Sequence, residues 1–68
     1  MGIKMSREEM IEDLKLTWAG IMRLDPENQI NINEAEASWR GLDDERLAHN
    51  YNGARAVLWQ LISERNPA

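Results

Sequence analysis

Apolar residues in the last third of the chain recur at steps of three and four over residues 42–65. At about 100° per residue, this spacing places them on one side of an α-helix, whereas a half-buried strand would alternate at every second residue. The stripe consists of Leu47, Tyr51, Ala54, Leu58, Leu61 and Ile62. One long amphipathic helix is therefore the element on which the rest of the chain has to pack.

The sequence also marks the ends of this helix. Asp43 is a suitable capping residue at its start, and Arg65 puts a positive charge near its C-terminal end, where the helix dipole favours one. Gly53 lies in the interior, where glycine costs about 1 kcal/mol relative to alanine, and Asn52-Gly53 is a turn signal. Because the stripe keeps its phase across Gly53, we predict one continuous helix, with Gly53 at a helix crossing or simply tolerated.

Two shorter helices are predicted upstream. Ser6 and Glu9 have the spacing of a capping box, which predicts a helix over residues 7–23. Its apolar face consists of Met10, Ile11, Leu14, Trp18, Ile21 and Met22. Asn33 followed by Glu36 predicts a second start, with a short helix over residues 34–40 that Gly41 ends. Residues 29–32 are expected to be an extended connector with both isoleucines directed into the core.

The predicted fold class is therefore all-α, a small three-helix domain over residues 1–68, with residues 1–5 and 66–68 frayed. We expect the helix over residues 7–23 to lie antiparallel to the long helix, and the short helix to lie across one end. A chain of 68 residues buries a modest fraction of its surface, and cysteine is absent, which excludes disulfides. Dimerisation into a helical bundle is thus an open alternative.

Composition limits the function classes. The net charge is −4, and the acids are concentrated in residues 1–45, which disfavours general nucleic-acid binding without excluding it. No apolar run reaches the length of a membrane span, and no signal-peptide core follows Met1. We therefore expect a cytoplasmic protein that does not enter the membrane.

The residues needed for catalysis or metal binding are not found in any recognised pattern. His49 is the only histidine and lies away from the apolar stripe, so we expect it in solvent. One histidine without cysteine forms no zinc or haem site, and neither a D-x-D-x-D-G loop nor a phosphate-binding glycine loop is present. The acidic residues at 8–9, 12–13 and 43–45 are attributed to helix starts. We predict no catalytic residues, no cofactor, no metal and no enzyme activity.

Each predicted helix carries one tryptophan. Trp18 and Trp39 are in phase with the apolar faces of their helices, which predicts core positions. Trp59 lies at the edge of the long stripe, where both a core position and a partner contact are open.

The hypothesis we favour is a small acidic protein-interaction module that acts as a regulator, inhibitor or adaptor through its helix faces. It rests on the apolar arc of the long helix, which Val57 and Trp59 widen beyond what one neighbouring helix would cover. A protein partner, or a second copy of the chain, would cover the remainder. The candidate contacts are Leu16, Arg55, Ala56 and Trp59.

Two alternatives involve nucleic acid. The basic end of the chain, with Arg46, Arg55 and Arg65, could make a nucleic-acid-associated modulator. The pattern L-x-D-x-x-L-A-x-x-Y-x-x-A over residues 42–54 resembles the Hha-type nucleoid modulators, and this resemblance implies such a role. Alternatively, the carboxylates of residues 8–45 could imitate nucleic acid toward a basic protein.

Overall fold

A computed structural model describes residues 5–65, which form three α-helices. These are α1 (Arg7–Leu24), α2 (Ile32–Arg40) and α3 (Asp44–Arg65). No strand occurs within residues 5–65, so the predicted all-α, three-helix fold is confirmed. Apart from Met5, the ends predicted to be frayed lie outside the described residues.

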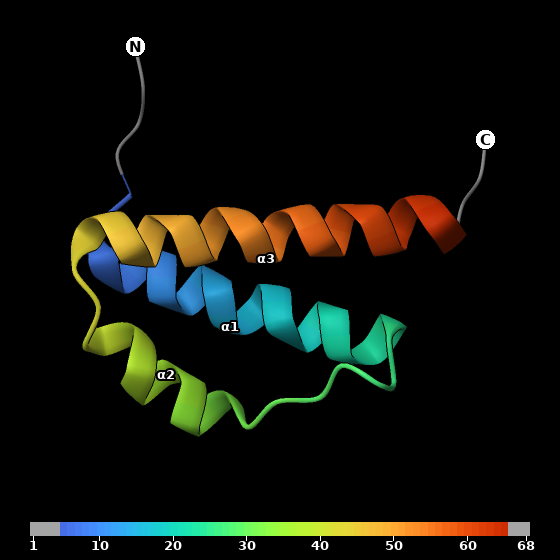
Figure 1. Ribbon diagram of the computed structural model, residues 1–68, viewed down its shortest axis with the longest axis horizontal. Helices are drawn as coiled ribbons and strands as arrows, with labels where there is room; N and C mark the ends of the chain where they lie inside the picture. Colours follow the sequence, from blue (N-terminus) through green and yellow to red (C-terminus); the bar gives the residue numbers. More distant parts are fainter. Residues whose placement is uncertain (1–4, 66–68) are drawn as a thin grey trace, which may run out of the picture.

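Helices α1 and α3 run in the same direction, so the antiparallel arrangement predicted for them is wrong. Figure 1 shows both helices starting at the same end of the molecule. Residues near the start, middle and end of α1 bind residues near the start, middle and end of α3. These pairs are Arg7 with Asp44, Asp13 with Tyr51, and Leu24 with Arg65. The reason is that the connector after α1 and the returning helix α2 carry the chain back to the start of α1 before α3 begins (Figure 1).

Helix α2 lies along the N-terminal half of α1, and not across one end of the bundle as predicted. Two ion pairs join these helices, at 3.3 Å between Lys15 Nζ and Glu36 Oε1 and at 2.7 Å between Arg40 Nη1 and Glu8 Oε1. The principal helix contacts are α1 with α3 and α1 with α2. Helix α1 is therefore the central element, with one neighbour on each side.

The helix starts follow the capping signals, with one correction. The capping box of Ser6 and Glu9 is formed, and Asp43 Oδ1 accepts the Arg46 backbone N–H at 2.8 Å. The cap of α2 is Asn31 and not Asn33, and its Oδ1 accepts the Glu34 N–H at 3.2 Å.

Both asparagines are followed three residues later by a glutamate, so the local pattern does not distinguish them. Capping by Asn31 places Ile32 in the helix, which corrects the predicted extended connector at that residue. It also leaves the Glu36 side chain available for Lys15 and Arg40.

The core lies where α1 meets its two neighbours. The buried apolar residues are Ile11, Leu14, Ile21, Trp39, Leu47 and Ala54. All were predicted to face the interior. Thr17 is also buried, and its hydroxyl donates a hydrogen bond of 2.7 Å to the Asp13 carbonyl oxygen. Trp18, Tyr51, Leu58 and Leu61 pack against this cluster and are partly buried.

Helix α3 is continuous through Gly53, as predicted, but the close helix contact occurs at another glycine. A Cβ atom at Gly53 would meet nothing within 4 Å, so Gly53 is tolerated and does not mark a helix crossing. At Gly20, a Cβ atom would lie 3.3 Å from Leu58 Cδ1. Gly20 is therefore the residue that lets α1 and α3 approach closely.

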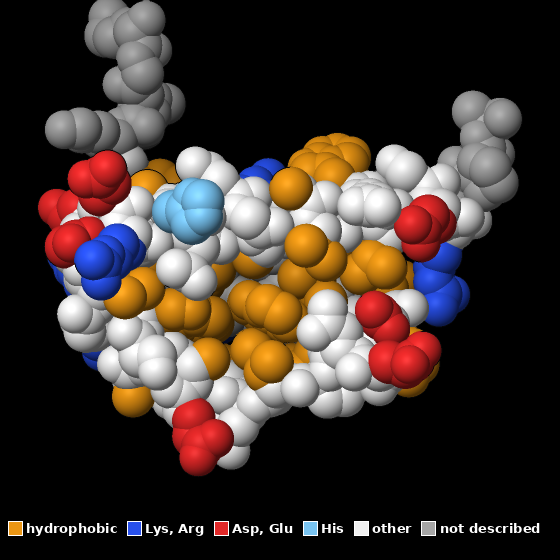
Figure 2. All heavy atoms as spheres, viewed as in Figure 1, with side chains coloured by type: hydrophobic (Ala, Val, Ile, Leu, Met, Phe, Trp, Pro, Cys, Tyr) orange, Lys and Arg blue, Asp and Glu red, His pale blue; other side chains and the backbone are white. Residues whose placement is uncertain are grey.

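The arrangement leaves part of the α1–α3 pair uncovered. Figure 2 shows hydrophobic side chains at the surface along the junction of α1 and α3, and a further hydrophobic group that projects from the outer edge of α3. None of the three described helices combines the length and the apolar character that crossing a membrane requires.

Candidate interaction surface

The α1–α3 pair has two opposite faces that can be told apart by their residues. Positions two apart on a helix differ by about 200°, so they point to roughly opposite sides. Trp18 of α1 and Val57 of α3 line the same shallow groove, together with Gly53 and Ala54. Consequently Leu16 and Trp59, each two positions away from one of these residues, point to the other face.

A second shallow groove lies on that other face. It is lined by Gly20, Arg23, Leu24, Leu58 and Ile62. Leu16 precedes Gly20 by one helical turn on α1, and Trp59 precedes Ile62 by three residues on α3. The two side chains therefore flank an apolar groove from opposite helices. We call the surface formed by these residues and the groove the Leu16–Trp59 face.

Leu16 and Trp59 are the most exposed large apolar side chains of the described residues. Leu16 is 72% exposed and Trp59 is 61% exposed, whereas Val57 reaches 39%. The core position left open for Trp59 is thereby excluded. Helix α2 packs mainly on α1 and so contributes little cover to α3. By contrast, the core position predicted for Trp39 is confirmed at 6% exposure, and Trp18 is half-buried against the core.

The other two candidates lie within one turn of Trp59. Ala56 and Arg55 precede it by three and four residues, and both are exposed. Arg55 is held in place: its Nη1 lies 3.2 Å from Asp13 Oδ2, and its guanidinium carbon lies 5.6 Å from the centre of the Tyr51 ring. Of the four predicted contact residues, Leu16 and Trp59 thus lie on the Leu16–Trp59 face, and Arg55 and Ala56 lie within one helical turn of Trp59 on α3.

A polar cluster connects the helices beside the groove. Tyr51 donates a hydrogen bond of 2.6 Å to Asp13 Oδ2, the same oxygen that Arg55 approaches. The hydrogen bond to Asp13 is the main reason that the pKa of Tyr51 is raised, and desolvation adds to it. The sequence assigns Asp13 only to the start of its helix, whereas the structure shows that it also binds Tyr51 and Arg55 of α3. Its spacing from Tyr51 in the chain offers no local pattern by which this contact could have been recognised.

A second charged cluster links α1 to α2. Arg40 pairs with Glu8 at 2.7 Å and with Glu36 at 2.8 Å. Hydrogen bonds from Arg40 are the largest cause that lowers the pKa of both carboxyls, and Lys15 contributes at Glu36. The pKa of Lys15 is in turn raised by its hydrogen bonds to Glu12 and Glu36. Each acid in this cluster forms an ion pair with Lys15 or Arg40. The cluster is therefore explained by the packing of α1 against α2.

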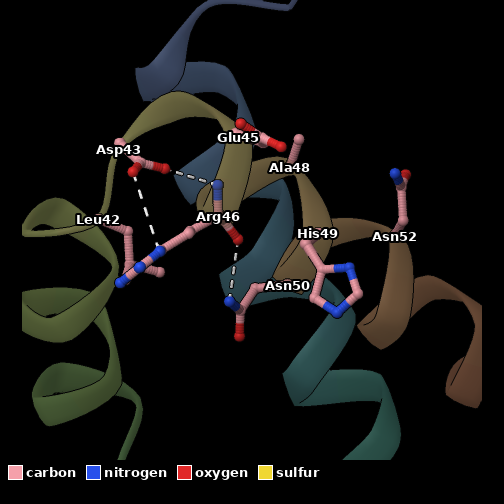
Figure 3. A pocket seen from close by; sticks show the side chains of 8 residues that line it. All are labelled: Leu42, Asp43, Glu45, Arg46, Ala48, His49, Asn50 and Asn52. Atoms are coloured by element: carbon pink, nitrogen blue, oxygen red, sulfur yellow. Dashed lines mark hydrogen bonds and ion pairs between the residues drawn. The ribbon is translucent and has the colours of Figure 1, made fainter.

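The start of α3 forms an open hollow, and the polar side chains around it do not point toward a common centre. Figure 3 shows Asp43 directed at Arg46 through two contacts, and Asn50 directed back at the Arg46 carbonyl oxygen. His49 and Asn52 point away from this group. His49 is exposed, as predicted. Within residues 5–65, no three His, Asp or Glu side chains lie close enough together to hold a metal ion.

The arginines of α3 do not form one basic surface. Arg46 and Arg55 are nine residues apart, which places them on roughly opposite sides of the helix. Arg55 is paired with Asp13, and Arg65 Nη2 donates to the Leu24 carbonyl oxygen at 3.0 Å. No specific geometric feature of these side chains therefore favours a nucleic-acid interface.

Comparison with known proteins adds no relative. No family model matches the chain, and neither a curated protein nor a solved structure matches it.

Proposed function

We propose that this protein is a protein-interaction module that acts as a regulator, inhibitor or adaptor through the Leu16–Trp59 face. The proposal rests on the high exposure of Leu16 and Trp59 and on their helical positions, each one turn before a residue that lines the groove, Gly20 on α1 and Ile62 on α3. Single exposed leucines are common, but clustered apolar groups with a polar rim are typical of protein contacts.

The residue types support the same conclusion. Tryptophan and arginine are enriched among residues that dominate binding energy, and both occur here as Trp59 and Arg55. Asp13 and Tyr51 fix the position of Arg55 before any partner arrives. Pre-ordering a long side chain reduces the entropy lost on binding. The face therefore combines an apolar anchor with a preorganised charged group.

The proposal can be tested by affinity capture from cells that express the tagged protein. Wild type would be compared with Leu16→Glu and Trp59→Ala, and bound proteins would be identified by quantitative mass spectrometry. We expect at least one protein to be retained by wild type and reduced at least about tenfold in both variants, since burial of a large apolar side chain contributes about that factor.

Ala37→Glu is the matched control, because Ala37 is exposed on α2 and lies outside the Leu16–Trp59 face. It should retain the same proteins as wild type. Circular dichroism would verify that each variant is folded. If folded Leu16→Glu and Trp59→Ala retained every protein that wild type retains, the proposed surface would be wrong.

A further inference from the structure

Helix α1 carries an exposed stripe along the Leu16–Trp59 face. Glu9, Glu12, Leu16, Ala19 and Arg23 follow one another at steps of three and four, which places them along one side of the helix. All are exposed except Ala19, which is half-buried. The stripe begins with acids, has an apolar centre, and ends with a base.

This stripe is complementary to itself when its direction is reversed. Leu16 lies midway between Glu9 and Arg23, seven residues from each. Seven residues are about two helical turns, so both charges lie within about 20° of the direction of Leu16. A two-fold axis through Leu16 would place Leu16 against its own copy, and each Glu9 opposite Arg23 of the second copy.

We propose that the Leu16–Trp59 face binds a second copy of this chain, with the two α1 helices antiparallel and crossing at Leu16. This inference rests on the proposed function, because it names the partner of the same face. Any other helix would have to present a base opposite Glu9, an acid opposite Arg23 and an apolar centre. The reversed stripe of the chain itself meets all three conditions.

The remaining positions fit this arrangement. The same axis brings Ala19 of the second copy near Glu12, and Gly20 of the second copy near Asp13. The small side chains at 19 and 20 leave room for the two helices to approach. Antiparallel helices also bring the opposite ends of their dipoles together. A two-fold interface uses the same patch on both copies, as this stripe requires.

The apolar and charged groups have different roles in this dimer. Exposed ion pairs contribute little to affinity because water and salt screen them. Two Glu9–Arg23 pairs would therefore mainly fix the direction and register of the helices. Burial of the Leu16 and Trp59 side chains would supply most of the affinity. The single-residue tests should separate these two contributions.

The first test is sedimentation equilibrium of the purified chain up to about 1 mM, which detects even weak association. We expect a concentration-dependent monomer–dimer equilibrium. Leu16→Glu should raise the dissociation constant at least about tenfold, because it buries a charge at the two-fold axis of both chains. Val57→Glu is the control, since Val57 faces the opposite groove, and it should leave the constant unchanged.

The second test reverses the charges. Arg23→Glu should weaken the dimer roughly fivefold, because two carboxylates would then face each other at both ends of the α1–α1 contact. Adding Glu9→Lys should restore at least half of that loss by exchanging the two charges. Glu9→Gln keeps an acceptor for the Ser6 N–H, so it removes the charge without removing the helix cap. It should weaken the dimer less than Arg23→Glu.

The outcomes distinguish this inference from the proposed function. A wild-type chain that stays monomeric at every concentration would overturn self-association, while affinity capture would still test binding of another protein. A dimer that Leu16→Glu leaves intact would place the interface elsewhere. A dimer that Leu16→Glu breaks, but that the charge exchange does not restore, would overturn the antiparallel register. Circular dichroism of each variant excludes unfolding as the cause.

Discussion

The hydroxyl of Tyr51 donates a 2.6 Å hydrogen bond to Oδ2 of Asp13, which joins the middle of α3 to the middle of α1. The contact stands beside the groove of the Leu16–Trp59 face and holds Arg55 at the same carboxylate. It therefore connects the register of the two parallel helices to the position of a side chain on the proposed surface.

Tyr51 should titrate above its ordinary pKa. The hydrogen bond to Asp13 favours the protonated phenol, and desolvation and the negative charge of Asp13 act in the same direction, so the folded protein raises the Tyr51 pKa. The corresponding stability is present below the ordinary value of 10.0 and is lost as pH rises through the folded-state value. Because Tyr51 is the only tyrosine, its absorbance near 295 nm reports this titration directly.

Asp13→Asn is the comparison for that titration. Removing the negative charge should lower the apparent pKa of Tyr51 toward its ordinary value, with the helical signal monitored at each pH. An unchanged titration in the folded variant would show that Asp13 does not control Tyr51 in solution.

Acid should destabilise the α1–α2 contact through Glu8 and Glu36. Arg40 lowers the pKa of both carboxyls, so their stabilising effect is present above the ordinary value of 4.5. It is lost as pH falls through their lower folded-state values. The thermal midpoint should therefore fall on acidification below about pH 4.5. Arg40→Gln should reduce that fall, because the neutral side chain no longer favours the charged carboxylates.

Arg46→Gln provides a matched control for Arg40. Arg46 is also exposed, but its guanidinium approaches Asp43 only to 3.9 Å. It should leave the acid dependence close to that of wild type. Equal acid dependence in wild type and Arg40→Gln would rule out the Arg40 cluster as its source.

Substitution of two helix glycines should have different effects. Gly53→Ala should raise the free energy of unfolding by about 0.5–1 kcal/mol, because Gly53 is helical and its Cβ position is open. Gly20→Val should gain no stability, since even a Cβ atom lies 3.3 Å from Leu58 Cδ1 and further methyl groups would force the helices apart. Urea denaturation measures both, and a destabilised Gly53→Ala would contradict a continuous α3.

The tryptophans should separate core from surface. Trp39→Ala should lower the free energy of unfolding by about 3–5 kcal/mol, because it removes a large buried ring. Trp59→Ala should change it by no more than about 0.5 kcal/mol, since the ring is mostly exposed in the single chain. Denaturation should be measured at low concentration, where self-association does not contribute. Comparable losses in the two variants would mean that Trp59 is packed within the monomer.

The sequence by itself determined the helices and most of the core. The stripe from Leu47 to Leu61, the capping box of Ser6 and the cap at Asp43 are all local patterns, and helical period and capping depend on residues within a few positions of one another. The continuity of α3 through Gly53 could be predicted for the same reason.

Only the tertiary structure decided how the helices are arranged. Whether α3 runs with or against α1 depends on the path of α2, which no helical period encodes, and Asn31 and Asn33 offer nearly equal local caps. The contact of Gly20 with Leu58 and that of Asp13 with Tyr51 depend on this direction. The position of Leu16 and Trp59 on one side of the molecule also depends on it. The helical period gives the direction of each side chain around its own helix, but only the packing of the helices sets these directions relative to each other.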